Sequence, residues 1–223
     1  MTEESLEDKL PPYKTTSHKF VPRYTGPKEK DLTQEQKDIR DEILSTRKRT
    51  GLAGPFGPWL ARPNIASPAQ KLGKACRYDT NLSFRESELV ILLTASKFKS
   101  HAEFDIHQGE ALRAGLSLDV IQSIPRDDEF SHDVAIRRIS CTLEKEVDEG
   151  KSSAHGLQRE IAIVCFTAEL LDTATVSDDT YQRTKQILGG DEVLVDITSI
   201  VGYYTYVAYT LNVFKIPSKP PIL

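Results

Sequence analysis

The sequence is poor in cysteine, and the few cysteines it has are scattered. Its three cysteines, Cys76, Cys141 and Cys165, form no CxxC pair and have no histidine at the spacing of a zinc site. We therefore expect reduced thiols, no metal and a cytoplasmic protein. Glycine-rich phosphate loops, GxSxG and HExxH are also missing, which favours a site without a cofactor.

Long apolar runs and an excess of one charge are absent as well. No run reaches the roughly 18 apolar residues of a membrane span. The first residues are acidic and contain proline, unlike a signal peptide. The 29 basic and 33 acidic residues leave a net charge of -4, too small to attract nucleic acid or an anionic membrane. We expect a soluble protein with neither kind of partner.

Proline is nearly absent from the middle of the chain. Eleven of the twelve prolines lie before Gln70 or after Phe214, and Pro125 stands alone between them. This asymmetry favours helices over a loop-rich β protein. With 223 residues, of which 39% are hydrophobic, the chain is long enough to build a sizeable core. The sequence therefore predicts an all-α fold.

The two ends of the chain differ from this middle. Residues 1–31 carry four prolines among mixed charges and little periodic apolar content. Such a segment predicts an extended arm, either disordered or wrapped around a neighbouring subunit. Residues 32–216 form the predicted all-α domain, and residues 217–223 form a short tail.

Helix start signals recur along the predicted domain. The spacing of a capping box, in which Glu or Gln follows a Ser or Thr after three residues, occurs at Thr33, Ser83 and Ser100. Ser67 precedes Pro68, a residue favoured at the first helical position. The predicted helices span residues 33–49, 67–78, 83–98, 100–115, 117–125, 131–150, 157–173, 178–188 and 191–213.

Two stretches of the domain resemble each other. RESELVILLTASKF and the helices after it align with QREIAIVCFTAELL and the helices after it, at an offset of about 72 to 76 residues. A duplication would make the core two related three-helix units, with Tyr181 standing where His107 stands. The alternative is a chance match between two trios of amphipathic helices.

The stretch SHAEFDIHQGEALRAGLS contains the main catalytic candidates. Glu103 precedes His107 by four residues, so both lie on one face of the predicted helix. The carboxylate would then fix the imidazole tautomer and make His107 a proton-transfer group. In the structural alternative, Glu103 turns back to the Ser100 amide as part of a capping box, and His107 is a satisfied core residue. The spacing alone does not separate the two.

Aromatic residues in two other segments are candidates for substrate binding. The loop of residues 50–68 carries Phe56 and Trp59, which either wall a small-molecule pocket or plug the edge of the domain. The last predicted helix carries Tyr203 and Tyr204, whose hydroxyls either act as donors in a site or lie in the core. With Glu88 from the apolar helix, these residues form the predicted substrate-binding set.

In this order, the motifs resemble the carboxymuconolactone decarboxylase family, within the alkylhydroperoxidase-D-like superfamily. The resemblance rests on GPFGPWLARP, RESELVILL, AEFDIHQGEALRAGLS and VDITSIVGYYTYVAYTLNVFKIP. It implies an all-α fold of this helix order, a homo-oligomer, and a pocket containing the histidine that matches His107. Peroxidase members of the superfamily carry CxxC before that histidine, where this chain has Glu103 to Ile106. Without that dithiol, this chain lacks the cysteine pair that their peroxide reduction requires.

The combined expectation is a cofactor-independent lyase, most specifically a decarboxylase of a small cyclic or aromatic carboxylic acid. His107 is expected to move the proton, Glu103 to orient it, and Tyr203 or Tyr204 to polarise a carbonyl. The homo-oligomer is expected to be a dimer, trimer or hexamer. Isomerisation or dehydration needs the same parts, and a non-catalytic small-molecule binder or scaffold is the alternative from another class. A closed cavity beside His107 would favour an enzyme.

Overall fold

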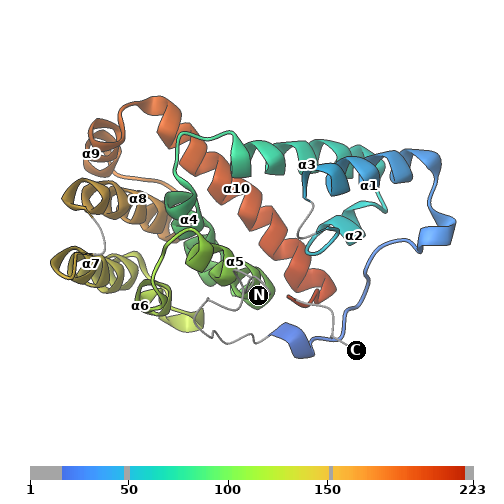
Figure 1. Ribbon diagram of the computed structural model, residues 1–223, viewed down its shortest axis with the longest axis horizontal. Helices are drawn as coiled ribbons and strands as arrows, with labels where there is room; N and C mark the ends of the chain where they lie inside the picture. Colours follow the sequence, from blue (N-terminus) through green and yellow to red (C-terminus); the bar gives the residue numbers. More distant parts are fainter. Residues whose placement is uncertain (1–16, 48–50, 151–152, 219–223) are drawn as a thin grey trace, which may run out of the picture.

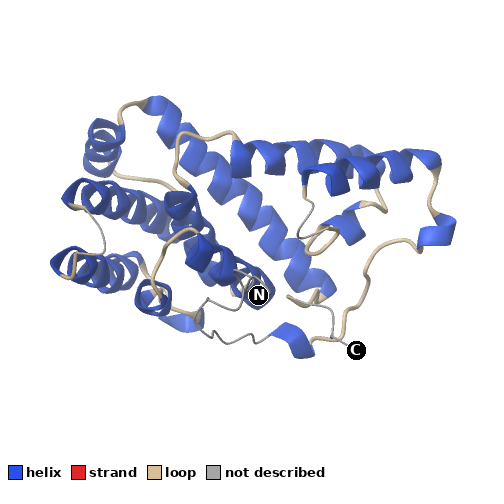
Figure 2. Cartoon of the chain, in the orientation of Figure 1, coloured by secondary structure: helices blue, strands red, loops and turns tan. Residues whose placement is uncertain are grey.

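The computed structural model describes residues 17–47, 51–150 and 153–218. This part of the chain contains ten α-helices and no strand, which confirms the predicted all-α fold (Figure 2). The helices are α1 (Gln34–Thr46), α2 (Phe56–Trp59), α3 (Pro63–Tyr78), α4 (Phe84–Lys97), α5 (His101–Arg113), α6 (Leu118–Ser123), α7 (His132–Asp148), α8 (Ala154–Thr173), α9 (Asp178–Leu188) and α10 (Asp191–Phe214). Among the described residues, no helix is both long enough and apolar enough to cross a membrane.

Most helices begin at residues that the sequence indicated. The capping boxes at Thr33 and Ser83 are both present, so each hydroxyl accepts a hydrogen bond from the third helical amide and that third side chain accepts one from the cap. Serine hydroxyls also cap the helices α6 to α9, at Ser117, Ser131, Ser153 and Ser177. These oxygens satisfy amides that have no partner inside the first helical turn.

One predicted helix start and one predicted capping box are wrong. α3 begins with Pro63, and Pro68 lies inside it. Pro63 takes the first helical position, where the missing amide hydrogen costs nothing. α5 does follow Ser100, but the hydroxyl of Ser100 caps no amide and has no described partner. Its ψ is 84°, whereas ψ of the Ser83 cap is 160°, so the predicted capping box with Glu103 is absent.

The long helix α10 crosses the molecule and separates two groups of helices (Figure 1). The helices α4 to α9 lie on one side of it, and α1 to α3 lie on the other. α4 packs against α5, α8 and α10, and residues 89–93 of α4 are each at most 1% exposed. A helix that is apolar around its circumference has to be central. The core therefore lies around α4 and α10.

α4 and α8, which open the two similar stretches of sequence, lie side by side. Their Arg-Glu dipeptides bond crosswise, since Arg85 donates to Glu160 and Arg159 donates to Glu86. In each pair, the arginine of one stretch contacts the glutamate at the equivalent position of the other stretch. Such an exchange is expected if the two stretches belong to units related by a local twofold axis. The duplication itself stays a prediction.

The described part of the N-terminal arm, residues 17–31, lies against its own chain. The amide and hydroxyl of Ser17 donate to Asp105 of α5 at 2.8 and 2.7 Å. The amide of Ser218 donates to the Ser17 hydroxyl at 3.1 Å, so both ends of the described chain meet on α5. Residues 1–16 lie outside the described residues, and their predicted disorder or contact with a neighbouring subunit stays a prediction.

Candidate active site

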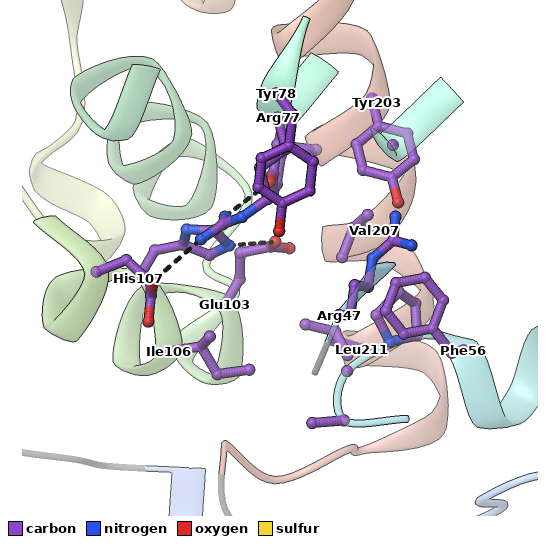
Figure 3. Close-up of a pocket in the computed structure, with 16 residues that line it drawn as sticks. Arg47, Phe56, Arg77, Tyr78, Glu103, Ile106, His107, Tyr203, Val207 and Leu211 are labelled. Carbon is purple, nitrogen blue, oxygen red and sulfur yellow. Dashed lines mark hydrogen bonds and ion pairs between the residues drawn. The ribbon is translucent and has the colours of Figure 1, made fainter. Parts of the chain in front are cut away.

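A cavity of about 80 Å³ lies between α3, α5, α10 and the loop before α2 (Figure 3). This volume holds several water molecules or part of a small ligand. Five of the predicted site residues line it, namely Phe56, Glu103, His107, Tyr203 and Tyr204. Three charged residues that were not predicted also line it, namely Arg47, Arg77 and Glu110.

His107 is held by a residue from a neighbouring helix. Its Nδ1 lies 2.8 Å from Oε2 of Glu88 on α4, whereas its Nε2 lies 3.8 Å from Oε1 of Glu103. A carboxylate accepts hydrogen bonds, so in this contact Nδ1 donates to Glu88 and Nε2 is left on the side of the cavity. At 3.8 Å Glu103 is too far to orient the ring by a hydrogen bond. Glu88 therefore takes the orienting position that the sequence assigned to Glu103.

Glu88, which was predicted to bind substrate, does not line the cavity, and that role stays a prediction. It is 1% exposed and lies behind His107. Its other oxygen is 3.5 Å from Nη1 of Arg77, and Nη2 of Arg77 donates to Glu110 at 3.1 Å. Arg77 thus compensates two buried carboxylates and connects α3 to both α4 and α5.

Glu103 is a buried carboxyl group beside the imidazole. It is 2% exposed, and its Oε2 has no hydrogen-bond partner among the described residues. Burial, followed by the negative charge of Glu88, raises the pKa of Glu103 well above its ordinary value of 4.5, while Arg77 opposes the rise. A raised pKa favours the protonated form of this carboxyl group, which can donate its proton.

Glu103→Gln is expected to stabilise the fold increasingly as the pH rises. The unfolded chain loses the Glu103 proton near its ordinary pKa of 4.5, whereas the folded chain keeps it to a higher pH. Folding of the wild type therefore weakens with rising pH through this group, and glutamine removes that dependence. The melting temperature of the variant relative to wild type should be higher at pH 8 than at pH 5. Glu144→Gln, on the exposed face of α7, controls for the loss of one charge. A difference that stays constant with pH would contradict the neutral carboxyl.

Tyr203 and Tyr204 bring two phenol hydroxyls to the cavity. Burial raises the pKa of both phenols, so both stay protonated and can donate hydrogen bonds. The ring of Tyr204 packs edge-on against His107, with 5.1 Å between ring centroids, and its hydroxyl accepts a 3.4 Å hydrogen bond from Arg77. A Cβ added to Gly73 would lie 2.1 Å from the Tyr203 hydroxyl oxygen. Glycine at this position of α3 therefore makes room for the Tyr203 ring.

The aromatic residues of the loop and α2 lie in two layers. Phe56 lines the cavity, whereas Trp59 does not. Trp59 packs edge-on against Phe56 and Tyr203 and stacks on Tyr206, with 4.8 Å between the stacked centroids. Its indole N–H donates to the Thr210 hydroxyl at 3.0 Å. Trp59 thus supports the residues of the cavity wall, and its predicted role in substrate binding stays a prediction.

Three cavity residues, Arg47, Arg77 and Glu110, were not predicted from the sequence. Glu110 follows His107 by three residues and so shares its helix face, a signal that was present in the sequence. Arg47 and Arg77 come from α1 and α3, and their neighbours along the chain include exposed charged residues. Nothing in the local pattern marks them as lining a cavity, so their place there depends on the packing of α3 against α1 and α10.

The cysteines lie apart from this site. None of the three lines the cavity, and all three are free. Burial, with the charge of Asp196 second, raises the pKa of Cys76 to about 11, so Cys76 is a thiol at neutral pH. Within the described residues, no group of three or more His, Cys, Asp and Glu side chains is placed to hold a metal ion.

Comparison with known proteins finds no family model, no curated protein and no solved structure that matches the chain. The resemblance of the motifs to the carboxymuconolactone decarboxylase family therefore stays a hypothesis.

Proposed function

We propose that the protein is a cofactor-independent enzyme that transfers a proton on a small cyclic or aromatic carboxylic acid, most specifically a decarboxylase. The observation that carries this proposal is the imidazole of His107, held at Nδ1 by the buried Glu88 and bordering a cavity. A histidine bonded to a buried carboxylate at a cavity is suited to general acid and base catalysis. A scaffold histidine would instead satisfy both nitrogens in the core.

In a decarboxylation, the bond from the substrate carbon to the carboxylate breaks and its electron pair stays on the substrate. The resulting enolate-like carbanion places negative charge on a carbonyl oxygen, to which Tyr203 or Tyr204 would donate a hydrogen bond. The raised pKa of Glu103 favours a proton on this carboxyl group, whose Oε1 lies 3.8 Å from Nε2 of His107. In the proposed step the Glu103 carboxyl gives its proton to Nε2 of His107, His107 passes a proton to the carbanion, and the resulting Glu103 carboxylate takes one proton back from solvent.

Two other functions use the same residues. An isomerase or a dehydratase would move a proton at the same position without releasing carbon dioxide. A non-catalytic protein would bind the acid without exchanging any of its protons. In each case we place the protein in the cytoplasm, where its three free cysteines would stay reduced.

One experiment in heavy water separates these functions. A panel of cyclic and aromatic carboxylic acids is incubated with the protein in D₂O and followed by NMR. A decarboxylase releases carbon dioxide and leaves deuterium on the carbon that carried it. An isomerase or dehydratase incorporates deuterium or loses water with every carbon retained. An acid that binds but remains unchanged would contradict an enzyme and favour the binding protein.

We further propose that the protein assembles through one face of α10. Val195, Tyr206, Tyr209 and Val213 are exposed on this helix at spacings that keep them close to one face. Light scattering at micromolar concentration should therefore give a mass at least about twice the 25.0 kDa of the chain.

The assembly proposal has a matched pair of variants. Tyr209→Glu should lower the measured mass toward that of the monomer, because it buries a charge in the contact. Leu44→Glu, at an exposed apolar residue of α1, should not. A wild-type protein that is already a monomer would overturn the assembly.

A further inference from the structure

Arg47 is a buried cation whose described contacts include no anion. It caps the C-terminus of α1, lines the cavity and is 6% exposed. Its guanidinium donates to the carbonyl of Gln70 at 3.0 Å and to the hydroxyl of Thr46 at 3.1 Å. It also lies over the ring of Phe56, 4.5 Å from the centroid. All three partners are neutral, so the described residues leave its charge uncompensated.

Three other arginines of the helical domain, Arg77, Arg85 and Arg159, contact carboxylates. Their carboxylate partners are Glu88 and Glu110 for Arg77, Glu146 and Glu160 for Arg85, and Glu86 for Arg159. Burying a charge without a partner is costly. A buried, uncompensated arginine in the wall of a cavity therefore indicates that an anionic ligand supplies the missing charge.

The geometry of Arg47 suits a carboxylate. A guanidinium has five N–H donors in a planar fork, and two described hydrogen bonds leave donors for a ligand. In Figure 3 the guanidinium lies beside the Tyr203 hydroxyl and close to Phe56, while His107 and Glu103 lie on the opposite side of the cavity. The anion-binding group and the proton-transfer group thus occupy different ends of one site.

We propose that Arg47, assisted by the Tyr203 hydroxyl, binds a carboxylate that the substrate keeps throughout the reaction. This assignment rests on the proposed function in taking the ligand to be a carboxylic acid. A carboxylate that departs as carbon dioxide loses its charge, so a cation bound to it would stabilise the ground state more than the transition state. Arg47 also lies across the cavity from His107, where the reacting carbon is placed. Tyr204, which packs against His107, is left to serve the reacting carbonyl.

Binding of two matched probes tests this site without any turnover. Benzoate carries the carboxylate, and benzamide is its neutral analogue of nearly equal shape. Calorimetric titration of wild-type protein should show benzoate binding about 10- to 100-fold more tightly than benzamide, the range for a hydrogen bond to a charged group. Equal affinities, or no binding of benzoate, would overturn the assignment without requiring any variant to fold.

Three variants then locate the preference. Arg47→Gln should abolish the preference for benzoate, and Arg47→Lys should retain part of it because the charge stays while the fork is lost. Arg62→Gln removes the same charge from an exposed residue before α3 and should leave the preference intact. Circular dichroism and the melting temperature establish that each variant is folded. A full preference in folded Arg47→Gln would overturn the role of Arg47.

The binding tests of Arg47 can succeed or fail independently of the proposed catalytic function. His107→Gln should bind benzoate like the wild type, because the anion is held at the other end of the cavity. If Arg47 controls benzoate binding but no acid is turned over, the binding site stands and the catalytic proposal fails. Where an acid is turned over, Arg47→Gln should raise KM by about 10- to 100-fold and change kcat less. The reason is that a retained carboxylate is bound equally in the ground state and in the transition state. A loss confined to kcat would contradict the retained carboxylate.

Discussion

His107→Gln is expected to lower the turnover of the substrate identified in D₂O by about 10²- to 10⁴-fold, the usual contribution of a general acid or base. Glutamine keeps a polar side chain in contact with Glu88 but has no nitrogen that can both accept and release a proton near neutral pH. Because His107 is buried but borders a cavity, glutamine can be accommodated there and the variant should fold. Stopped or continuous assays of product formation give the rate.

Two further variants separate His107 from its neighbours. His132→Gln alters a half-buried histidine that is bonded to Asp172 away from the cavity, so its rate should equal that of the wild type. Glu88→Gln removes the carboxylate that fixes the imidazole tautomer and should lower the rate by less than the loss of the imidazole itself. Normal turnover in folded His107→Gln would move the catalytic centre elsewhere.

The fold was predictable to the extent that local chemistry decides it. Capping residues such as Ser83 and Ser131 determine where helices begin, and their side chains act within three residues along the chain. The start of α3 was missed because two prolines, Pro63 and Pro68, both offer a plausible first position. The local sequence carries no information that chooses between them, and the α3 contacts with α1 and α10 are not local.

The candidate site was predictable only in part, because several of its contacts join residues that are distant in the sequence. The spacing of Glu103 and His107 correctly placed both on one helix that borders a cavity. It could not identify Glu88 as the hydrogen-bond partner, because that contact joins residues 19 positions apart on two helices. One signal was available, since a single carboxylate within the apolar run ELVILL has to be buried and therefore needs a partner. The sequence therefore predicts that Glu88 has a partner, but it does not identify His107 or Arg77 as that partner.

Arg77→Met is expected to destabilise the protein by about 3–5 kcal/mol, the typical cost of removing one member of a buried ion pair. The side chain of Arg77 is 14% exposed and lies between Glu88 and Glu110, which are both nearly inaccessible. Methionine replaces the volume of the arginine stem but leaves Glu88 without its cation. For a chain of this size the loss corresponds to a decrease in melting temperature of roughly 6 to 20 °C. Urea denaturation gives the free energy directly.

The matched control is Arg138→Met, because Arg138 forms a shorter ion pair than Arg77 does with Glu88. The Arg138 to Glu129 contact is 2.7 Å, but the two side chains are 43% and 64% exposed. Solvent screens such a pair, so its loss should cost less than about 1 kcal/mol. Combining Arg77→Met with Glu88→Gln should recover part of the stability, because the second change removes the carboxylate that the first leaves unpaired. Two results would contradict the idea that the buried network holds α3 to α4 and α5. One is that Arg77→Met lowers the free energy of unfolding no more than Arg138→Met does. The other is that the double variant loses the full sum of the two single losses in free energy.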